Sequence, residues 1–546
     1  MTRGCGEAFS PRFYIPRLLV LIRRARQAKN WAVSNTEGIE LPLGTAFRRI
    51  ATAAALLSAG AFVVPAHGQE MAEGLQLQLR RWYRQASRSA PGTWGIAVAD
   101  QQGNLLWSIN PDKAMIPAST VKLLTTGFAR TILGGDARRS TRVVGLGRVD
   151  EGTGEWMGKW ALELNGDPTL ESPSGGGPRL DDLAEQLAAQ GIRRLRGPME
   201  VVSADGPAEA LYPSAWRPAN RGSIYAPLVG SLTLHENVVW IHVKPGSKSG
   251  RRAVLVETSP AGLEALVDVH ATTVAGYRSR LSIRRMADGG YLINGSIGVN
   301  ASVRRLVTVA SDPKAILAAA WARALQDAGI EWDRSPNPIT VEGDATDVLA
   351  EVTSATFDSI ASEVNRRSLN IGAELLLQWA GGRDHAPELL TEHVQQVAGV
   401  DGGVHLVDGS GMSHEDRVTP ATFIYYMANF LSTPAGRNFP YLLPANGEGT
   451  LTRLAGGMPA AGVVHAKTGT LSGVSTLVGY LGQKDGMYLV SLMYNGPRSK
   501  TAKRQQWQAF RLLGANGVTI PSEVNDEPDQ DTPAAAGDEI GGEPEN

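Results

Sequence analysis

The feature that most constrains the fold of this 546-residue chain is that its two ends carry mixed helices and strands, whereas its middle is rich in strands. At the front, apolar periodicity predicts two helices flanking two strands, at 71–86, 94–99, 105–109 and 119–133. At the back, the same patterns predict helices, then strands, then a last helix, at 357–380, 420–431, 463–466, 475–481, 487–494 and 501–513. The two ends therefore predict one α/β domain, with the middle of the chain inserted into it.

The middle, about residues 140–345, alternates strand-like segments with turns that are rich in glycine and proline. Its clearest strands are predicted at 160–164, 238–243 and 281–285. It ends with a helix predicted over 312–328, for which Ser311 is the expected N-cap. We therefore expect a discontinuous domain that consists of residues 70–139 and 350–520. Residues 140–349 are expected to form a strand-rich insertion of one or more domains.

The segment before the first predicted helix resembles a secretion signal. Arg48 and Arg49 precede an apolar run over 50–64, and a small-residue pattern ends at Gly68. This is the order of the charged, hydrophobic and cleavage regions of a signal peptide. We therefore expect a signal peptide over 45–68, with a retained membrane anchor as the alternative, although the run is short for a membrane span.

The two extremities of the chain do not predict folded domains. Residues 1–44 match neither a domain nor a targeting sequence, and we expect a non-native or disordered extension, with translation starting downstream. From Glu523 onward the chain holds nine acidic residues and no basic ones, with many prolines, glycines and alanines. We therefore expect a disordered acidic tail over 521–546.

The charge balance and the number of cysteines limit which compartment and which partners the sequence predicts. The whole chain has a net charge of -1, and without residues 1–68 it keeps 44 basic and 51 acidic residues. This gives no reason to expect a nucleic-acid partner, and no pattern indicates an oligomeric state. Cys5, the only cysteine, lies in the segment expected to be removed, and the nine histidines are scattered. We therefore expect no metal and no cofactor, and a protein secreted into the periplasm, free or loosely associated with the membrane.

Three short motifs occur in the order S-x-x-K, S-x-N and K-T-G. Ser119 and Lys122 lie one turn apart at the start of a predicted helix, so their hydroxyl and amine share a face near free backbone N–H groups. A serine beside a group that can take its proton is a candidate nucleophile. The second motif lies within the helical stretch 357–380, and the third ends the strand predicted over 463–466. The candidate site residues are Ser119, Lys122, Ser368, Asn370, Lys467, Thr468, Gly469 and Thr470.

Context separates these motifs from accidental matches. Similar patterns stand at residues 108–110, 248–250, 311–314 and 335–337. Ser311 is expected to cap a helix, and residues 248–250 lie in a polar, glycine-rich turn. We interpret residues 409–411 as a structural turn near the site. The chain has no G-x-S-x-G or H-E-x-x-H motif, so common esterase and zinc-protease sites are not indicated.

Longer stretches around the motifs resemble the class C low-molecular-mass penicillin-binding proteins, the D-alanyl-D-alanine carboxypeptidase/endopeptidase family. They are P-A-S-T-V-K-L-L-T-T at 117–126, G-D-P-T-L at 166–170, D-G-S-G-M-S at 408–413, R-V-T-P at 417–420 and H-A-K-T-G-T at 465–470. The resemblance covers roughly residues 75–515. It implies an α/β transpeptidase domain of the penicillin-binding-protein and serine β-lactamase type, an antiparallel sheet flanked by helices, with strand-rich domains inserted between the first and second motifs.

The resemblance implies that Ser119 is acylated and that Lys122 activates it. An ammonium cannot act as a base, so Lys122 must be neutral when it accepts the proton. Burial and the neighbouring cation Lys467 would both lower its pKa. No glutamate stands out in the sequence as a separate base. We therefore expect Lys122 to serve in both acylation and deacylation.

The second motif is expected to act on the leaving group and the substrate amide. Ser368 would relay the proton to the leaving amine. Asn370 would hold the substrate amide and the side chain of Lys122.

The third motif is expected to bind the end of a peptide. Lys467 would supply positive charge for the terminal carboxylate, with the hydroxyls of Thr468 and Thr470 on either side of Gly469 bonding to it. The backbone N–H groups of Ser119 and Thr470 would form the oxyanion hole.

The resemblance implies carboxypeptidase action, with endopeptidase action as an addition, on the stem peptides of peptidoglycan, and acylation by β-lactams. Two alternatives stay open at this point. One is a serine β-lactamase on the same fold, which the long insertion disfavours. The other is a non-catalytic protein that binds or senses the cell wall.

Overall fold

The computed structural model describes residues 71–336 and 346–522, all within one compact unit, Gly68–Asn546. The predicted N-terminal extension and signal peptide, and nearly all of the predicted acidic tail, lie outside the described residues. Within the described part, no helix is long and apolar enough to cross a lipid bilayer.

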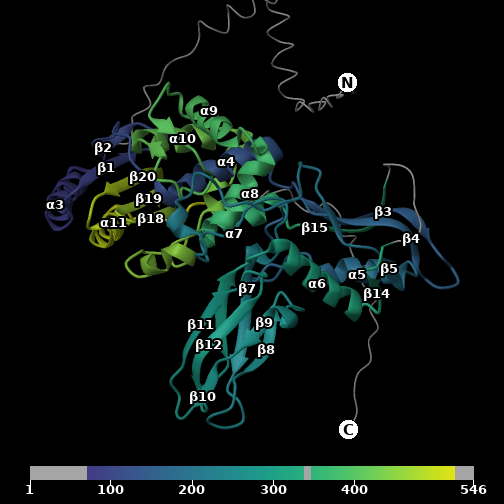
Figure 1. Cartoon of the computed structure of the whole chain (residues 1–546). Helices are drawn as coiled ribbons and strands as arrows, with labels where there is room; N and C mark the ends of the chain where they lie inside the picture. The colour runs from purple at the N-terminus through teal and green to yellow at the C-terminus, as the bar shows by residue number, and fades with distance from the viewer. Residues whose placement is uncertain (1–70, 337–345, 523–546) are drawn as a thin grey trace, which may run out of the picture. The chain divides into compact units, whose positions relative to one another are not determined.

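A five-stranded antiparallel sheet joins the two ends of the chain (Figure 1). Its strands, in spatial order, are β18 (Val464–Leu471), β19 (Val474–Gln483), β20 (Gly486–Asn495), β1 (Thr93–Ala99) and β2 (Leu105–Ile109). The first strands of the chain thus pair with the last ones. This is the arrangement expected for one α/β domain built from both ends, and the predicted fold class is confirmed.

The alternating side chains of β1 show how the sheet divides two hydrophobic layers. Ile96 and Val98 face a layer that holds two helices, α3 (Glu73–Ser89) and α11 (Ser499–Leu513). Ala97 and Ala99 face the opposite layer. That layer contains the helices α4 (Val121–Leu133), α7 (Phe357–Arg367), α8 (Asn370–Gly381), α9 (Ala386–Ala398) and α10 (Pro420–Leu431). The sheet is therefore buried on both faces.

The helical stretch predicted over 357–380 is broken into α7 and α8. Ser368 follows α7 in the left-handed conformation, with φ +59°, and Leu369 donates its N–H back to the carbonyl of Val364 at 3.0 Å. A left-handed serine has no clear local signal, and the prediction of one continuous helix over 357–380 is wrong. The break turns the chain between Ser368 and Asn370.

The inserted segment contains four further sheets around a shared hydrophobic cluster. One sheet has the order β15 (Asp347–Thr353), β3 (Ser140–Val149), β4 (Trp156–Glu163) and β6 (Glu200–Val202). A two-stranded sheet pairs β14 (Glu331–Asp333) with β5 (Arg194–Arg196). A third has the order β13-β7-β8, with bounds Arg304–Val309, Val238–Lys244 and Val254–Ser259. The fourth has the order β10 (Thr272–Val274), β12 (Tyr291–Gly298) and β11 (Arg280–Arg285). Strand β9 (Val267–Val269) also pairs with β12.

Two helices complete the insertion, α5 (Leu180–Ala189) and α6 (Pro313–Asp327). The N-cap of α6 is Asp312, whose carboxylate accepts from the N–H groups of Lys314 and Ala315, so the prediction that Ser311 caps this helix is wrong. Because Pro313 occupies the first turn, the cap falls on the residue directly before it. Strand β15 crosses the expected boundary near residue 350 and pairs with β3, and the expected domain boundaries stay a prediction.

The remaining elements are short. A two-stranded ladder joins β16 (Val404–His405) to β17 (Arg417–Val418). Short 3₁₀ helices occur at Ala118–Thr120, Pro218–Asn220, His235–Asn237, Glu264–Leu266, Pro434–Gly436, Phe439–Leu442 and Gly449–Leu454.

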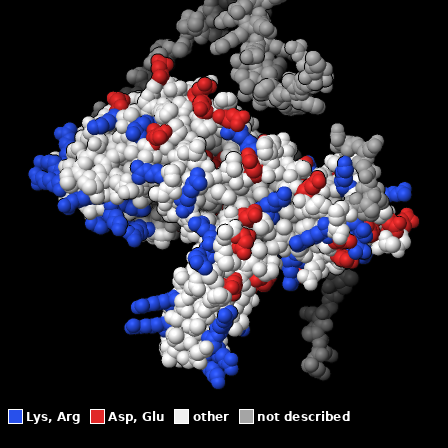
Figure 2. Space-filling model, in the orientation of Figure 1, with Lys and Arg blue, Asp and Glu red and all other residues white. Residues whose placement is uncertain are grey.

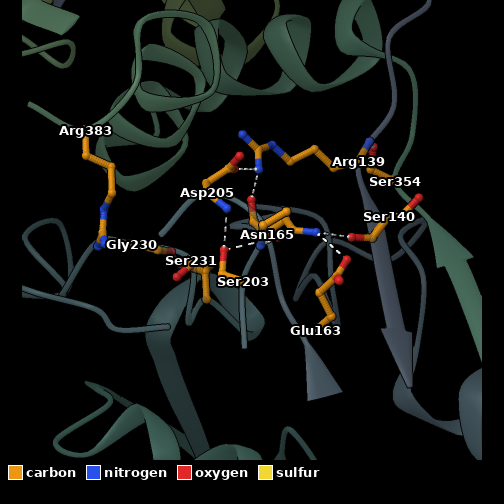
Figure 3. A network of polar contacts seen from close by, with 12 residues as sticks. Arg139, Ser140, Glu163, Asn165, Ser203, Asp205, Gly230, Ser231, Ser354 and Arg383 are labelled. Carbon is orange, nitrogen blue, oxygen red and sulfur yellow. Dashed lines mark hydrogen bonds and ion pairs between the residues drawn. The ribbon is translucent and has the colours of Figure 1, made fainter. Parts of the chain in front are cut away.

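A polar network joins the start of the insertion to the helical layer (Figure 3). The guanidinium of Arg139, just before β3, bonds to the Asp205 carboxylate and to the carbonyl of Asn165. It also lies over the ring of Trp379 on α8, 4.8 Å from the ring centre. The Asn165 side chain in turn accepts from the Ser203 hydroxyl at 3.1 Å. Arg139 thus connects three separate stretches of chain at the junction.

Basic side chains are unevenly distributed over the described residues. Figure 2 shows Lys and Arg gathered over the α3 and α11 end of the molecule and along the sheet of β10, β11 and β12. On α3 the exposed residues include Arg80, Arg81, Arg84 and Arg88. On α11, Lys503 lies beside Thr470 of β18. One of these basic residues, Lys503, therefore lies beside the strand that carries the third motif.

Substitution of Phe430 in α10 tests the packing of the helical layer. The Phe430 ring is fully buried and packs against Tyr426 and Phe439, with ring centres 5.2 and 4.8 Å away. We expect Phe430→Ala to lower the free energy of unfolding by about 3–5 kcal/mol, because the lost contacts leave a cavity. Urea unfolding measures this. Leu77→Ala, on the exposed side of α3, should change stability by about 0.5 kcal/mol or less, and equal stability of the two variants would contradict the assigned core.

Candidate active site

Ser119 and Lys122 meet at the start of α4, as the motif spacing predicts. A turn of 3₁₀ helix over Ala118–Thr120 leads into α4, and Ala118 has a positive φ of 52°. The amine of Lys122 donates to Ser119 Oγ at 3.3 Å. Lys122 is fully buried, whereas Ser119 is partly exposed. A ligand can therefore reach the hydroxyl while the amine behind it stays out of solvent.

Two glycines allow the chain to pack directly against the Ser119 turn. A Cβ on Gly411 would lie 2.0 Å from the carbonyl oxygen of Ala118, and Gly411 has a φ of +74°. A Cβ on Gly469 would lie 2.7 Å from the carbonyl oxygen of Pro117 and 2.1 Å from Thr476 Oγ1. The third motif and the 409–411 turn therefore contact the nucleophile turn at backbone distance.

The Lys122 amine connects three segments of the chain. Besides Ser119, it donates to Asn370 Oδ1 at 2.7 Å and to the Ser410 carbonyl at 2.6 Å. The amide nitrogen of Asn370 donates to the Tyr225 carbonyl at 2.8 Å, which links the second motif to the insertion. Residues 409–411 are thus the structural turn near the site that the sequence predicts, and this turn contacts Lys122 directly.

Lys467 joins the second and third motifs. Its amine donates to Ser368 Oγ at 3.0 Å and to the Thr468 carbonyl at 2.9 Å. Lys467 and Thr468 are buried, and Thr470 is exposed with its hydroxyl 3.4 Å from the Lys503 amine. All three residues lie inside β18, which pairs with β19 through Leu471. The prediction that the strand ends before Lys467 is therefore wrong, because pairing with β19 extends it.

The two buried lysines have different electrostatic surroundings. Burial lowers the pKa of Lys122 from its ordinary 10.5 to about 8, and the carboxylates of Asp408, Glu374 and Asp416 oppose this shift. Burial lowers the pKa of Lys467 well below its ordinary value, and the neighbouring cations Lys122 and Lys503 lower it further. Lys122 is therefore able to exchange a proton near neutral pH.

The structure brings all the predicted site residues into one region. Lys122 contacts Ser119 and Asn370, Lys467 contacts Ser368, and Gly469 backs the Ser119 turn. The accidental matches lie elsewhere, residues 311–314 at the start of α6 and residues 248–250 between β7 and β8. The match at 108–110 lies at the end of β2, and residue 337 of the fourth match lies outside the described residues.

Three buried carboxyl groups near Lys122 escaped the sequence analysis, those of Glu374, Asp408 and Asp416. One signal was available, because Glu374 stands four residues after Asn370 and so shares its face of α8. The sequence around Asp408 is typical of a turn, and nothing in it indicates that the Asp408 carboxylate lies near a lysine.

Gly469→Ala tests the close approach behind Ser119. The added methyl group would overlap backbone and side-chain atoms of two neighbouring segments, so we expect a loss of about 1–3 kcal/mol in unfolding free energy. The matched control is Gly456→Ala, where a Cβ meets nothing within 4 Å and φ is not positive. Chemical unfolding compares the two. Equal stability of Gly469→Ala and wild type would show that the site has more space than the structure gives it.

Comparisons with known proteins agree with this arrangement. A sequence model of the D-Ala-D-Ala carboxypeptidase 3 (S13) family matches residues 83–516. The chain is 29% identical over 425 residues to a D-alanyl-D-alanine carboxypeptidase of an Actinomadura species, covering 74% of this chain and 77% of that protein. It is 24% identical over 459 residues to penicillin-sensitive carboxypeptidase A of Dictyostelium discoideum, covering 76% and 86%.

Among solved structures, penicillin binding protein 4 of Haemophilus influenzae matches with a TM-score of 0.63 and 20% identity, over 79% of this chain and 98% of that one. The same protein complexed with a β-lactam matches with a TM-score of 0.58. These two likenesses concern the fold. The family match spans most of the chain and includes all three motifs. The chain therefore belongs to the D-Ala-D-Ala carboxypeptidase 3 (S13) family and is a serine-type D-alanyl-D-alanine carboxypeptidase.

Proposed function

We propose that Ser119 is the nucleophile that attacks the carbonyl carbon of the penultimate D-alanine in a peptidoglycan stem peptide. The observation that carries this proposal is the 3.3 Å contact between the accessible Ser119 hydroxyl and the fully buried Lys122 amine. A hydroxyl becomes a useful nucleophile only when a nearby base takes its proton. Among the described residues, Lys122 is the side chain that contacts Ser119 Oγ.

Acylation then proceeds by proton transfer along the site. Neutral Lys122 takes the Ser119 proton as the Oγ–C bond forms. The C–N bond to the terminal D-alanine breaks, and Ser368 passes its proton to the leaving amine. The proton held by Lys122 then replaces the one that Ser368 gave, so both groups return to their starting forms. The contact of Ser368 Oγ with the Lys467 amine supports this role, because it places the hydroxyl beside a second group that can carry a proton. Asn370 holds the Lys122 amine through its Oδ1.

Deacylation repeats the proton transfers with water. Lys122 takes a proton from a water molecule as that water attacks the ester carbon. The ester C–O bond breaks, Ser119 regains its proton and the shortened peptide leaves. Lys122 serves both steps in this scheme.

Substrate binding falls to β18 and the Ser119 turn. The terminal carboxylate of the stem peptide bonds to Lys467, Thr468 and Thr470, and Lys503 beside Thr470 favours the approach of an anion. The backbone N–H groups of Ser119 and Thr470 receive the oxyanion, each such donor being worth about 3–4 kcal/mol in the transition state.

β-Lactams acylate the same serine, because their strained amide presents a similar carbonyl and carboxylate. The β-lactam complex of the similar Haemophilus protein supports this. Endopeptidase cleavage of a cross-link is the same reaction with a longer leaving amine. The predicted signal peptide supports action in the periplasm, where these substrates lie.

Ser119→Ala tests the nucleophile. We expect D-alanine release from a pentapeptide ending in D-Ala-D-Ala to fall by about 10³-fold or more. Intact-mass measurement after penicillin treatment should find one adduct on wild type and none on the variant. Ser311→Ala, in the accidental S-x-x-K match, should keep both properties.

Three outcomes would contradict the proposal. An adduct that persists on Ser119→Ala would place the nucleophile elsewhere. Rapid turnover of a chromogenic cephalosporin, with no D-alanine release, would indicate a β-lactamase. Peptidoglycan binding with no D-alanine release would indicate a binding protein.

Lys122 gives the site a characteristic pH dependence. A lowered lysine pKa means that the neutral form dominates above about pH 8, so the acylation rate should rise as pH increases through that value. The second-order rate of acylation by penicillin, measured from pH 6 to about 10, provides the profile. Lys122→Arg, which stays charged over this range, should lose about 10²-fold or more in rate. A rate independent of pH would exclude Lys122 as the base.

A further inference from the structure

Three buried carboxyl groups lie beside the Lys122 amine and have no part in the mechanism above. Glu374, Asp408 and Asp416 are 6%, 2% and 0% exposed. Glu374 comes from α8, while Asp408 and Asp416 lie within the loop between α9 and α10, on either side of the 409–411 turn. Buried carboxyl groups are expensive unless they are bonded or neutral, so their bonding shows what each one does.

Glu374 and Asp408 hold the 409–411 turn from two sides. Glu374 Oε1 accepts from the N–H groups of Gly409 at 3.1 Å and Ser410 at 2.9 Å. Asp408 Oδ1 accepts from Ser410 at 3.1 Å and Gly411 at 2.6 Å. Each N–H of the turn therefore points at a carboxylate. This fixes the direction of the opposite, carbonyl side of the turn.

The carbonyl groups of the same turn hold α4. The Ser410 carbonyl accepts from the Lys122 amine at 2.6 Å, and the Gly409 carbonyl accepts from Thr125 Oγ1 at 2.7 Å. Glu374 is thus connected to the base through one residue, Ser410, whose N–H donates to the Glu374 carboxylate and whose carbonyl accepts from the Lys122 amine. A change at Glu374 is transmitted to Lys122 through the backbone of that residue.

The charges that face Lys122 come from several elements. Asp408, Glu374 and Asp416 oppose the effect of burial on its pKa, and Lys467 is the neighbouring cation. Lys467, equally buried, faces the cations Lys122 and Lys503. Of two lysines at the same depth, Lys122 therefore has carboxylates beside it and Lys467 has cations. The acid groups therefore explain why the pKa of Lys122 is lowered less than the pKa of Lys467.

We propose that Glu374 is a positioning residue for the reaction, which holds the 409–411 turn against Lys122 and places a negative charge beside the amine. The proposal rests on the function proposed for Lys122. Glu374 touches neither Ser119 nor the expected position of the substrate, so it acts only through Lys122. Without such a charge, burial would leave Lys122 a much weaker base, whereas a base is most effective when its pKa is near the working pH.

Glu374 is the member of the cluster whose charge can be removed while its bonds are kept. Burial and the nearby Asp408 raise the pKa of Glu374 to about 7, so its negative charge is present over the range in which Lys122 titrates. Burial and the nearby Asp408 raise the pKa of Asp416 strongly, so these two aspartates affect each other. Asp408 also uses Oδ2 to accept from the Ser413 N–H at 2.7 Å, so an asparagine there would lose a bond. The single oxygen of a glutamine at 374 can still accept from Gly409 and Ser410.

The experiment compares Glu374→Gln, which removes the charge and keeps the turn, with Glu374→Asp, which keeps the charge and shortens the reach. The probe is penicillin, and the readout is the pH profile of the second-order acylation rate. For Glu374→Gln we expect the rising limb to move to lower pH by about 1 unit, with a plateau within about threefold of wild type. For Glu374→Asp we expect the limb to stay in place and the plateau to fall by about tenfold.

The matched control is Glu415→Gln, the same change on the exposed side of the same loop, which should leave the profile unchanged. Folding is checked by thermal unfolding, and if one Glu374 variant does not fold, the other still decides. An unshifted limb in folded Glu374→Gln, or an unchanged plateau in folded Glu374→Asp, overturns the proposal. Failure of the proposed function looks different, because wild type itself would then form no adduct on Ser119.

Discussion

The hydrogen bonding of the Lys122 amine is the interaction on which the rest of the site depends. The amine is fully buried and reaches Ser119, Asn370 and the Ser410 carbonyl. These partners come from the turn before α4, from α8 and from the loop before α10, so a single group connects segments up to 288 residues apart in sequence. A buried ammonium with poor bonding would be strongly destabilising, and a neutral amine is the form that burial favours. The requirement for a well-bonded lysine with a lowered pKa therefore explains both the convergence of the motifs and their chemistry.

The discontinuous sheet makes this convergence possible. Because β1 pairs with β20, the start of α4 lies next to β18, and Gly469 lets β18 approach the Ser119 turn. The insertion enters after α4 and returns before α7, and it contributes the Tyr225 carbonyl to Asn370 and Glu236 to an ion pair with Arg367. Both contacts flank Ser368, whose left-handed backbone requires support from its surroundings. The insertion therefore helps to shape the second motif.

Much of this was predictable from the sequence, for identifiable reasons. The Ser119–Lys122 pair follows from helical spacing, and the strands of the sheet follow from apolar alternation and turn residues. The left-handed Ser368 and the extension of β18 past Lys467 were not predictable, because tertiary contacts set them. The Asp312 cap could have been predicted, because Pro313 fixes where the helix begins. The burial of the carboxyl groups around Lys122 is also a tertiary property, and only the spacing of Glu374 from Asn370 gave a local signal for it.

A crystal structure of the penicillin-treated protein tests the central claim most directly, because it locates every bond that the acyl group makes. The account predicts an ester on Ser119 Oγ, the ester carbonyl oxygen between the N–H groups of Ser119 and Thr470, and the penicillin carboxylate beside Lys467 and Thr468. An acyl group on any other side chain, or a carboxylate bound away from β18, would contradict it.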